Sequence, residues 1–192
     1  CAPAKLYYLG LVKVRIADAY SRAASGGIGC AKAAGNYAGQ LYPTNLAKDK
    51  GSQQIIWTDS NEHKYLREAG TMNVFFINGE KLITAPNTGT ILDGVTRKSS
   101  IQIAKDLGIH VDIRKISVDE IKEASRNNSL KEIFGTGTAA VVSEISEFEH
   151  KDELFTLPEI EGSYAKKLKE SLVNIQTNKS EDPHNRPRTQ TA

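Results

Sequence analysis

The sequence lacks the features of nucleic-acid-binding and membrane-spanning proteins. Its 192 residues include 25 lysines and arginines against 23 aspartates and glutamates, and no basic run is interleaved with aromatic residues. No apolar stretch approaches the ~20 residues that a membrane span needs, and no charged-then-apolar leader opens the chain. We therefore expect no nucleic-acid partner and no membrane partner.

Cysteine and histidine are scarce as well. The two cysteines, Cys1 and Cys30, favour a reduced thiol in a cytoplasmic protein over a disulfide framework. The four histidines are scattered, and none lies at ligand spacing from cysteine, aspartate or glutamate. We expect no metal site, and a Ser-His-Asp hydrolase is poorly supported.

Strand patterns and amphipathic helix patterns are mixed without a regular β-α-β alternation. The clearest pattern is a hairpin, in which β-branched and aromatic residues flank the turn Asn78-Gly79. The mixture predicts a fold of the α+β or irregular α/β class rather than a doubly wound sheet. The expected strands cover residues 11–16, 53–57, 74–77, 80–84, 111–116 and 139–145, and the expected helices cover 32–42, 96–107, a segment that follows the cap at Ser117, and 164–175.

One domain should account for most of the chain. Residues 11–177 carry the strand and helix patterns, and residues 1–10 are interpreted as the end of an N-terminal part or an interdomain segment. The first residue is cysteine rather than methionine, which suggests a fragment or a processed chain. Residues 178–192 have little to bury, so we expect a disordered tail there.

Lys32 follows a glycine-rich turn at residues 25–29. This block lacks the Gly-Lys-Ser/Thr ending of a nucleotide phosphate loop and the third glycine of a dinucleotide-binding fingerprint. Small neighbouring residues leave room for a bulky group, and a lysine in a partly desolvated pocket can attack an aldehyde as an amine. The phenol of Tyr37 would then reach a group attached to Lys32. The competing interpretation is an ordinary solvated helix lysine.

Two further blocks have chemistry that matches such an amine. Glu68 lies on or just before the first strand of the hairpin, where a carboxylate is rigidly mounted and can keep a pyridine nitrogen protonated. The segment 94–96 opens a helix and offers free N–H groups and a hydroxyl to a phosphate. A tight loop is expected at 135–138, and residues 137–139 are a second candidate donor loop. Taken singly, these are a surface carboxylate and two ordinary turns.

Together the blocks resemble the C-terminal, cofactor-carrying domain of branched-chain amino-acid aminotransferases, which are fold-type IV pyridoxal-phosphate enzymes. The similarity runs from about Lys5 to Asp182. The triplet Thr71-Met72-Asn73 favours this branch over D-amino-acid transaminases and aminodeoxychorismate lyases. The resemblance implies the large domain of the D-amino-acid aminotransferase-like fold over residues 11–177, with pyridoxal 5'-phosphate as its cofactor.

The resemblance also implies a role for each site residue. The lysine that matches Lys32 is the catalytic residue and forms a Schiff base with the cofactor, while Tyr37 binds the ring oxygen and Glu68 the pyridine nitrogen. The other implied contacts are Thr71 near the ring, Val95, Thr96 and Thr138 at the phosphate, and Thr138 and Ala139 at the substrate carboxylate.

The implied reaction is transamination of leucine, isoleucine and valine with 2-oxoglutarate, which yields glutamate and branched 2-oxo acids, in a cytoplasmic homodimer of amino-acid biosynthesis. Three departures from the family pattern stand out. We expect the family's N-terminal domain to be missing from this chain. Ile28 replaces a usual threonine, and Ala140 and Ser143 stand where some members carry a Cys-x-x-Cys switch. The alternatives are a non-catalytic cofactor-binding or assembly module and another fold-type IV activity.

Overall fold

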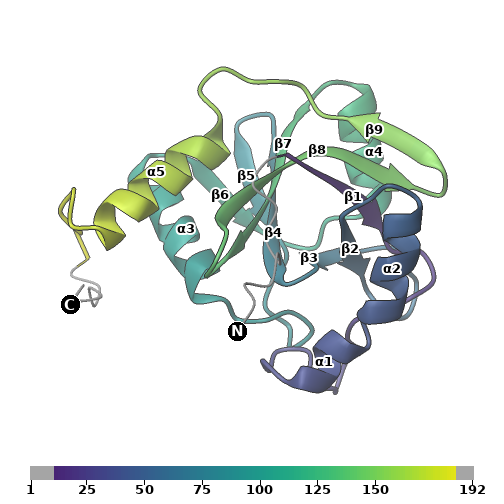
Figure 1. Ribbon diagram of the computed structural model, residues 1–192. Coiled ribbons are helices and arrows are strands. Elements are labelled where there is room, and N and C mark those ends of the chain that lie inside the picture. The colour runs from purple at the N-terminus through teal and green to yellow at the C-terminus, as the bar shows by residue number, and fades with distance from the viewer. Residues whose placement is uncertain (1–10, 185–192) are drawn as a thin grey trace.

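The computed structural model describes residues 11–184, and these form one mixed sheet of nine strands with helices around it (Figure 1). None of the helices in this range is long and apolar enough to cross a membrane. The strands are β1 Val12–Ile16, β2 Gln54–Thr58, β3 Leu66–Ala69, β4 Met72–Asn78, β5 Lys81–Thr84, β6 His110–Ile113, β7 Leu130–Gly137, β8 Val141–His150 and β9 Glu153–Thr156. The helices are α1 Ala34–Ala38, α2 Leu41–Asp49, α3 Val95–Asp106, α4 Val118–Arg126 and α5 Tyr164–Gln176.

Six of the strands close into a ring. Strand β1 pairs in parallel with both β2 and β8. Antiparallel pairing then joins β2 to β3, β3 to β4, β4 to β7 and β7 to β8. Because each strand is paired with the next, the ring is a small barrel whose interior is filled by side chains. Strands β5 and β6 extend the sheet from β4, and β9 extends it from β8.

Strand β4 carries an uninterrupted apolar run because both of its faces are buried. Val74 and Phe76 belong to the cluster that fills the barrel and meets α4. Phe75 and Ile77 face the other way and pack under α3 and α5, where the Phe75 ring stacks on Phe134 with centroids 5.3 Å apart. Figure 1 shows α3 and α5 together on one side of the barrel and α4 on the other.

These observations confirm the predicted fold class, but two predicted turns are wrong. In the hairpin, Asn78 pairs with Lys81, so the turn is one residue later than expected and consists of Gly79 and Glu80. The predicted loop at 135–138 is mostly strand, since β7 runs to Gly137 and the turn begins at Thr138. A Cβ on Gly135 would lie 2.8 Å from Met72 Cε, so this glycine accommodates a neighbouring side chain instead of a turn.

The helix predicted over 32–42 is also wrong in its bounds. Lys32 lies in the turn before α1, and α1 ends at Ala38. Pro43, which directly follows the predicted helix, lies in the first turn of α2. Proline fits there because the N–H groups of a first turn have no partner within the helix. The strand expected over 111–116 ends at Ile113.

Part of the tail predicted to be disordered is placed against the rest of the molecule. The N–H groups of Lys179 and Ser180 donate to the carbonyl of Asn174, which ends α5 with local hydrogen bonds. His184 Nε2 lies 3.0 Å from the carboxylate of Asp106 at the end of α3. Residues 178–184 thus have local contacts with α5 and α3, and disorder of the tail over 178–192 stays a prediction. Residues 185–192 and the expected segment 1–10 lie outside the described residues.

The first turn of α5 is held by Glu132, a buried residue of β7. The carboxylate of Glu132 accepts hydrogen bonds from Ser163 Oγ at 2.7 Å, Tyr164 N at 2.7 Å and Ala165 N at 3.0 Å. The Ser163 hydroxyl in turn accepts from Lys166 N. A carboxylate at this position satisfies N–H groups that the helix leaves unpaired, and it interacts favourably with the helix dipole.

We predict that Glu132→Ala lowers the free energy of unfolding by about 2–3 kcal/mol, because three donors at a buried helix end lose their acceptor. Urea denaturation measures this change. Glu170→Ala, which removes an exposed carboxylate from the same helix, should change stability by less than about 0.5 kcal/mol. Equal losses in the two variants would show that Glu132 does not anchor α5.

Candidate functional site

Glu68 lies within a buried polar cluster where β3 turns into β4. Only 3% of the residue is exposed. Its Oε2 accepts hydrogen bonds from Leu92 N at 2.9 Å and from Asn73 Nδ2 at 3.3 Å. Asn73 is also the residue paired with Glu68 across the two strands. The carboxylate therefore has a fixed orientation on a rigid element, as predicted for this segment.

Arg22 is the cation that faces this carboxylate. Its Nε lies 2.6 Å from Glu68 Oε1, and both side chains are almost completely buried. The Nε–H has no aligned acceptor, so the contact is an ion pair rather than a well-formed hydrogen bond. The other guanidinium nitrogens donate to the carbonyls of Gly29 at 3.0 Å and Thr90 at 3.2 Å. Arg22 thereby connects three segments that are distant in sequence.

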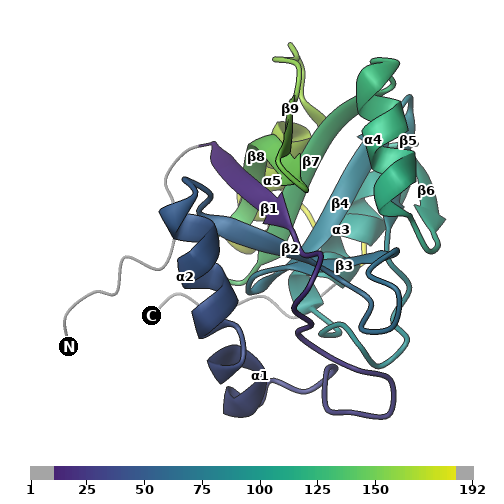
Figure 2. The same ribbon diagram turned by 90° about the vertical axis from the view of Figure 1, so that its right-hand side faces the viewer.

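Close packing requires a glycine at position 29 of the glycine-rich turn. A Cβ on Gly29 would lie 2.6 Å from Ala23 Cβ and 2.9 Å from Thr90 Cα. Only a residue without a side chain allows the turn to approach the segment before α3 this closely. Figure 2 shows the segment between β1 and α1 running below the sheet.

Burial raises the pKa of the Glu68 carboxyl above its ordinary value, because water no longer stabilises the charged form. Three groups oppose this rise: the guanidinium of Arg22, the N–H of Leu92 and the ammonium of Lys32. The charge of Lys32 thus acts on the carboxylate even though the two residues come from different segments. Lys32 and Glu68, two of the predicted site residues, are thus coupled through charge, while no hydrogen bond or ion pair joins them among the described residues.

Lys32 itself is exposed, in the turn before α1. The described residues therefore do not form the partly desolvated pocket that its small neighbours predict; Cys30 and Ala31 are exposed as well. Its Nζ lies 5.2 Å from the centroid of the Tyr37 ring, which agrees with the expected proximity of amine and phenol. Asn36, buried in α1, fixes the turn, because its Nδ2 donates to the carbonyls of Ile28 at 2.8 Å and Ala31 at 2.9 Å.

The N-terminus of α3 has the properties of an anion seat. Gly94 is the N-cap residue, and no side chain caps the helix, so its first N–H groups keep their hydrogen-bonding capacity. Val95 is 77% exposed and Thr96 is half-buried. The remaining predicted residues lie in exposed turns: Thr71 between β3 and β4, and Thr138 with Ala139 between β7 and β8.

This set of groups fits pyridoxal phosphate. The cofactor has an aldehyde, a pyridine nitrogen and a phosphate, and it needs an amine, a carboxylate and an anion seat to match. Lys32 offers the amine, Glu68 the buried carboxylate, and the uncapped start of α3 the seat. Asn73 joins the last two, because its Nδ2 also donates to the carbonyl of Leu92 at 2.9 Å.

Sequence reasoning missed Arg22 and Asn36. Arg22 stands alone in a polar loop, and nothing in its local pattern indicates that it is buried beside Glu68. The sequence around Asn36 likewise gives no indication that this side chain is buried and holds the turn before α1. The one hint was indirect, since a carboxylate mounted on an inner strand needs a cation nearby to remain charged.

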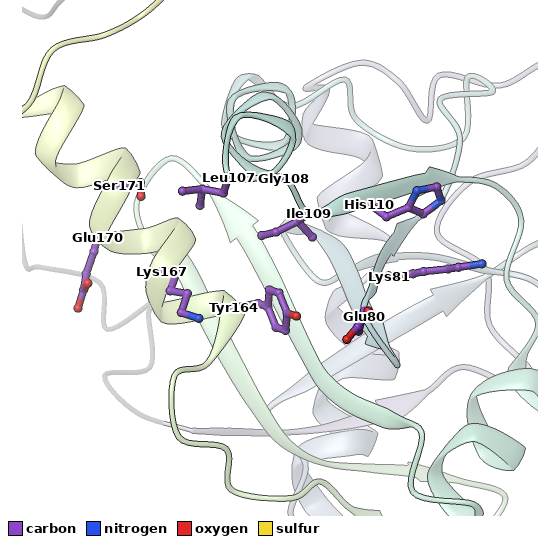
Figure 3. Close-up of a pocket in the computed structure, with 10 residues that line it drawn as sticks. All are labelled: Glu80, Lys81, Leu107, Gly108, Ile109, His110, Tyr164, Lys167, Glu170 and Ser171. Carbon is purple, nitrogen blue, oxygen red and sulfur yellow. The ribbon is translucent and has the colours of Figure 1, made fainter.

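An open pocket of about 670 Å³ lies elsewhere on the molecule and contains none of the predicted site residues. It is bounded by the β4–β5 turn, the segment after α3 and helix α5 (Figure 3). Lys81 and Lys167 line it from different elements. Neither a buried carboxylate nor an uncapped helix start belongs to its lining, so its chemistry does not match that of the Glu68 cluster.

We predict that Arg22→Leu destabilises the protein by about 3–5 kcal/mol at neutral pH, because a buried carboxylate loses its cation. Without Arg22 the pKa of Glu68 should rise further above that of the unfolded chain. The folded state then binds the proton more tightly, so stability falls as the pH rises from the ordinary carboxyl range towards neutrality. Urea denaturation at several pH values measures this slope against the wild type.

The double variant Arg22→Leu, Glu68→Gln is the control for this prediction. It removes the buried charge, so the additional pH slope should disappear. If the slope persists in the double variant, it does not originate from Glu68.

Several named proteins are similar to this chain in sequence. It is 40% identical over 188 residues to a probable branched-chain-amino-acid aminotransferase of Staphylococcus epidermidis, a match that covers 95% of this chain and 52% of the relative. The chain thus spans about half the length of the curated relatives it matches.

Solved structures show the same fold. The branched-chain amino acid aminotransferase of Escherichia coli superposes with a TM-score of 0.79 at 28% identity, over 97% of this chain and 59% of that chain. The branched-chain amino acid aminotransferase of T.th., solved with pyridoxamine 5'-phosphate, superposes with a TM-score of 0.70 at 26% identity, over 85% of this chain and 50% of that chain. These matches confirm the fold-type IV architecture expected from the sequence.

The family model described as amino-transferase class IV matches residues 8–148, which include the Lys32 turn, the Glu68 cluster and the start of α3. With the family model, the relatives and the fold in agreement, this chain belongs to the class IV aminotransferases and is similar to their branched-chain members.

Proposed function

We propose that the protein carrying this chain is a pyridoxal-phosphate-dependent aminotransferase that converts leucine, isoleucine and valine to their 2-oxo acids, with 2-oxoglutarate as the amino acceptor. The observation that carries the proposal is the buried carboxylate of Glu68, paired with Arg22 and influenced by the charge of Lys32. The names of the relatives and the pyridoxamine phosphate in one neighbouring structure support the substrate class and the cofactor.

When bound, the cofactor supplies an electron-withdrawing ring that stabilises negative charge on the substrate Cα. Glu68 would hold a proton on the pyridine nitrogen. Oε1 contacts Arg22, and a carboxylate oxygen has more than one lone pair, so it retains the capacity to accept this N–H. Arg22 would keep the carboxylate ionised for that purpose.

Lys32 would attach the cofactor through its amine and, once a substrate amine has replaced it, move the proton from the substrate Cα. Tyr37, whose ring lies beside the lysine, would bind the ring oxygen. The start of α3, with Val95 and Thr96, would bind the phosphate together with Thr138. The turn at Thr138 and Ala139 would bind the substrate carboxylate, and Thr71 would support the ring.

A second candidate is a cofactor-binding or assembly module that does not turn over substrate by itself. The exposure of Lys32 among the described residues is the observation that favours it. A D-amino-acid transaminase or an aminodeoxychorismate lyase would use the same groups on other substrates. The homodimer and the cytoplasmic location stay predictions.

We predict that Lys32→Ala in the natural full-length protein lowers transamination of leucine by about 10³-fold or more, because both cofactor attachment and proton transfer lose their amine. Formation of the 2-oxo acid from leucine and 2-oxoglutarate measures the activity. Lys48→Ala, which removes an exposed lysine from α2, should retain wild-type turnover.

Borohydride reduction with added pyridoxal phosphate, followed by peptide mass analysis, should place the label on Lys32 of the wild type. Undiminished turnover by Lys32→Ala would contradict the assigned role. A wild type that is labelled at Lys32 but has no turnover would favour the binding module, and release of pyruvate would favour a lyase.

A further inference from the structure

Asn73 makes contacts at both ends of the candidate cofactor site. It is 5% exposed, on β4. Its Nδ2 donates to the Leu92 carbonyl at 2.9 Å and to Glu68 Oε2 at 3.3 Å. The N–H of Leu92 donates to the same carboxylate oxygen at 2.9 Å. Asn73, Glu68 and Leu92 therefore form a closed set in which each residue is bonded to the other two.

The amide oxygen of Asn73 determines the residue at position 94. A Cβ on Gly94 would lie 2.2 Å from Asn73 Oδ1 and 3.4 Å from Asn73 Cγ. The φ angle of Gly94 is −65°, which any residue adopts, so backbone conformation does not require glycine here. The Asn73 amide instead leaves no room for a Cβ at position 94 unless that side chain shifts. Gly94 is also tied to Leu92, because its N–H donates to the Leu92 carbonyl at 2.9 Å.

From these contacts we propose that Asn73 is a positioning residue that fixes the carboxylate of Glu68 relative to the phosphate seat at the start of α3. The inference rests on the proposed function. Pyridoxal phosphate carries its phosphate on a short arm of the same rigid ring that holds its nitrogen. The separation of these two groups varies only within narrow limits, so the two protein groups must be held at a matching separation to bind them at the same time. One buried amide contacts Glu68 and the segment 92–94, and no other described side chain is hydrogen-bonded to both.

A purely structural role for Asn73 leads to a different expectation. In that case removing the Asn73 amide lowers overall stability and reduces the affinity for every ligand by the same factor. A positioning role changes how well the two ends of one ligand bind at the same time. The affinity gained from the phosphate group, measured as the ratio of the dissociation constants of pyridoxal and pyridoxal phosphate, distinguishes the two roles.

The test uses the natural full-length protein and the variant Asn73→Ala, titrated with pyridoxal phosphate and with pyridoxal by absorbance. We expect the affinity for pyridoxal phosphate to fall about tenfold or more, and the ratio of the two constants to shrink by a similar factor. An unchanged ratio would overturn the inference. Thermal unfolding followed by circular dichroism checks that the variant is folded.

Gly94→Ala supplies a second, independent arm. The added methyl group should displace the Asn73 amide and reduce the same ratio, whereas in the Asn73→Ala background the space is free and the second change should add little. Additive effects of the two substitutions would contradict the inference. Gly39→Ala, at an exposed glycine with ample space, is the matched control and should leave the ratio unchanged.

The outcomes separate this inference from the proposed function. If the wild type binds neither ligand and borohydride labels no lysine, the proposed function fails and the inference with it. If the wild type binds both ligands and Gly94→Ala leaves their ratio unchanged, only the inference about Asn73 fails. If Asn73→Ala does not fold, the same ratio of dissociation constants is measured for Asn73→Ser and for Gly94→Ala. A reduced ratio in both supports the inference, and an unchanged ratio overturns it.

Discussion

The buried ion pair between Glu68 and Arg22 is the interaction on which the rest of the site depends. A carboxylate that is 3% exposed cannot remain charged without a cation and hydrogen-bond donors around it. Arg22 supplies the cation, and Leu92 and Asn73 supply the donors. These partners belong to three different segments. The charge of Glu68 therefore holds together the loop before α1, strands β3 and β4, and the segment before α3.

The barrel makes this arrangement possible by mounting Glu68 on rigid strands. Strands β3 and β4 are joined by a tight turn and packed by the apolar interior. The loop before α1 and the segment before α3, which carry other groups of the site, are anchored where they approach β3 and β4. Asn36 holds the turn before α1, and Arg22 connects it to the segment before α3. The functional groups on the loops are thus positioned by the packed strands to which the loops are anchored.

Much of the local structure could be predicted from residue patterns. The hairpin around Gly79, the capped helix after Ser117 and the amphipathic helix α5 all form, because their signals are short-range. The errors arise where a residue serves a distant neighbour. Gly135 was interpreted as a turn residue, but it makes room for Met72 of the adjacent strand. Pro43 is a local case, because proline occurs in the first turn of a helix as well as after a helix end, and here it lies in the first turn of α2.

The sequence by itself determined the fold class, the family and the order of the chemical groups along the chain, since a motif such as the Lys32 block needs no partner to be recognised. Only the tertiary structure decided that Glu68 is buried beside Arg22 and that Asn73 reaches the segment before α3. It also showed that Lys32 is exposed among the described residues. The physical reason is that burial and charge pairing depend on residues far away in sequence, which no local pattern specifies.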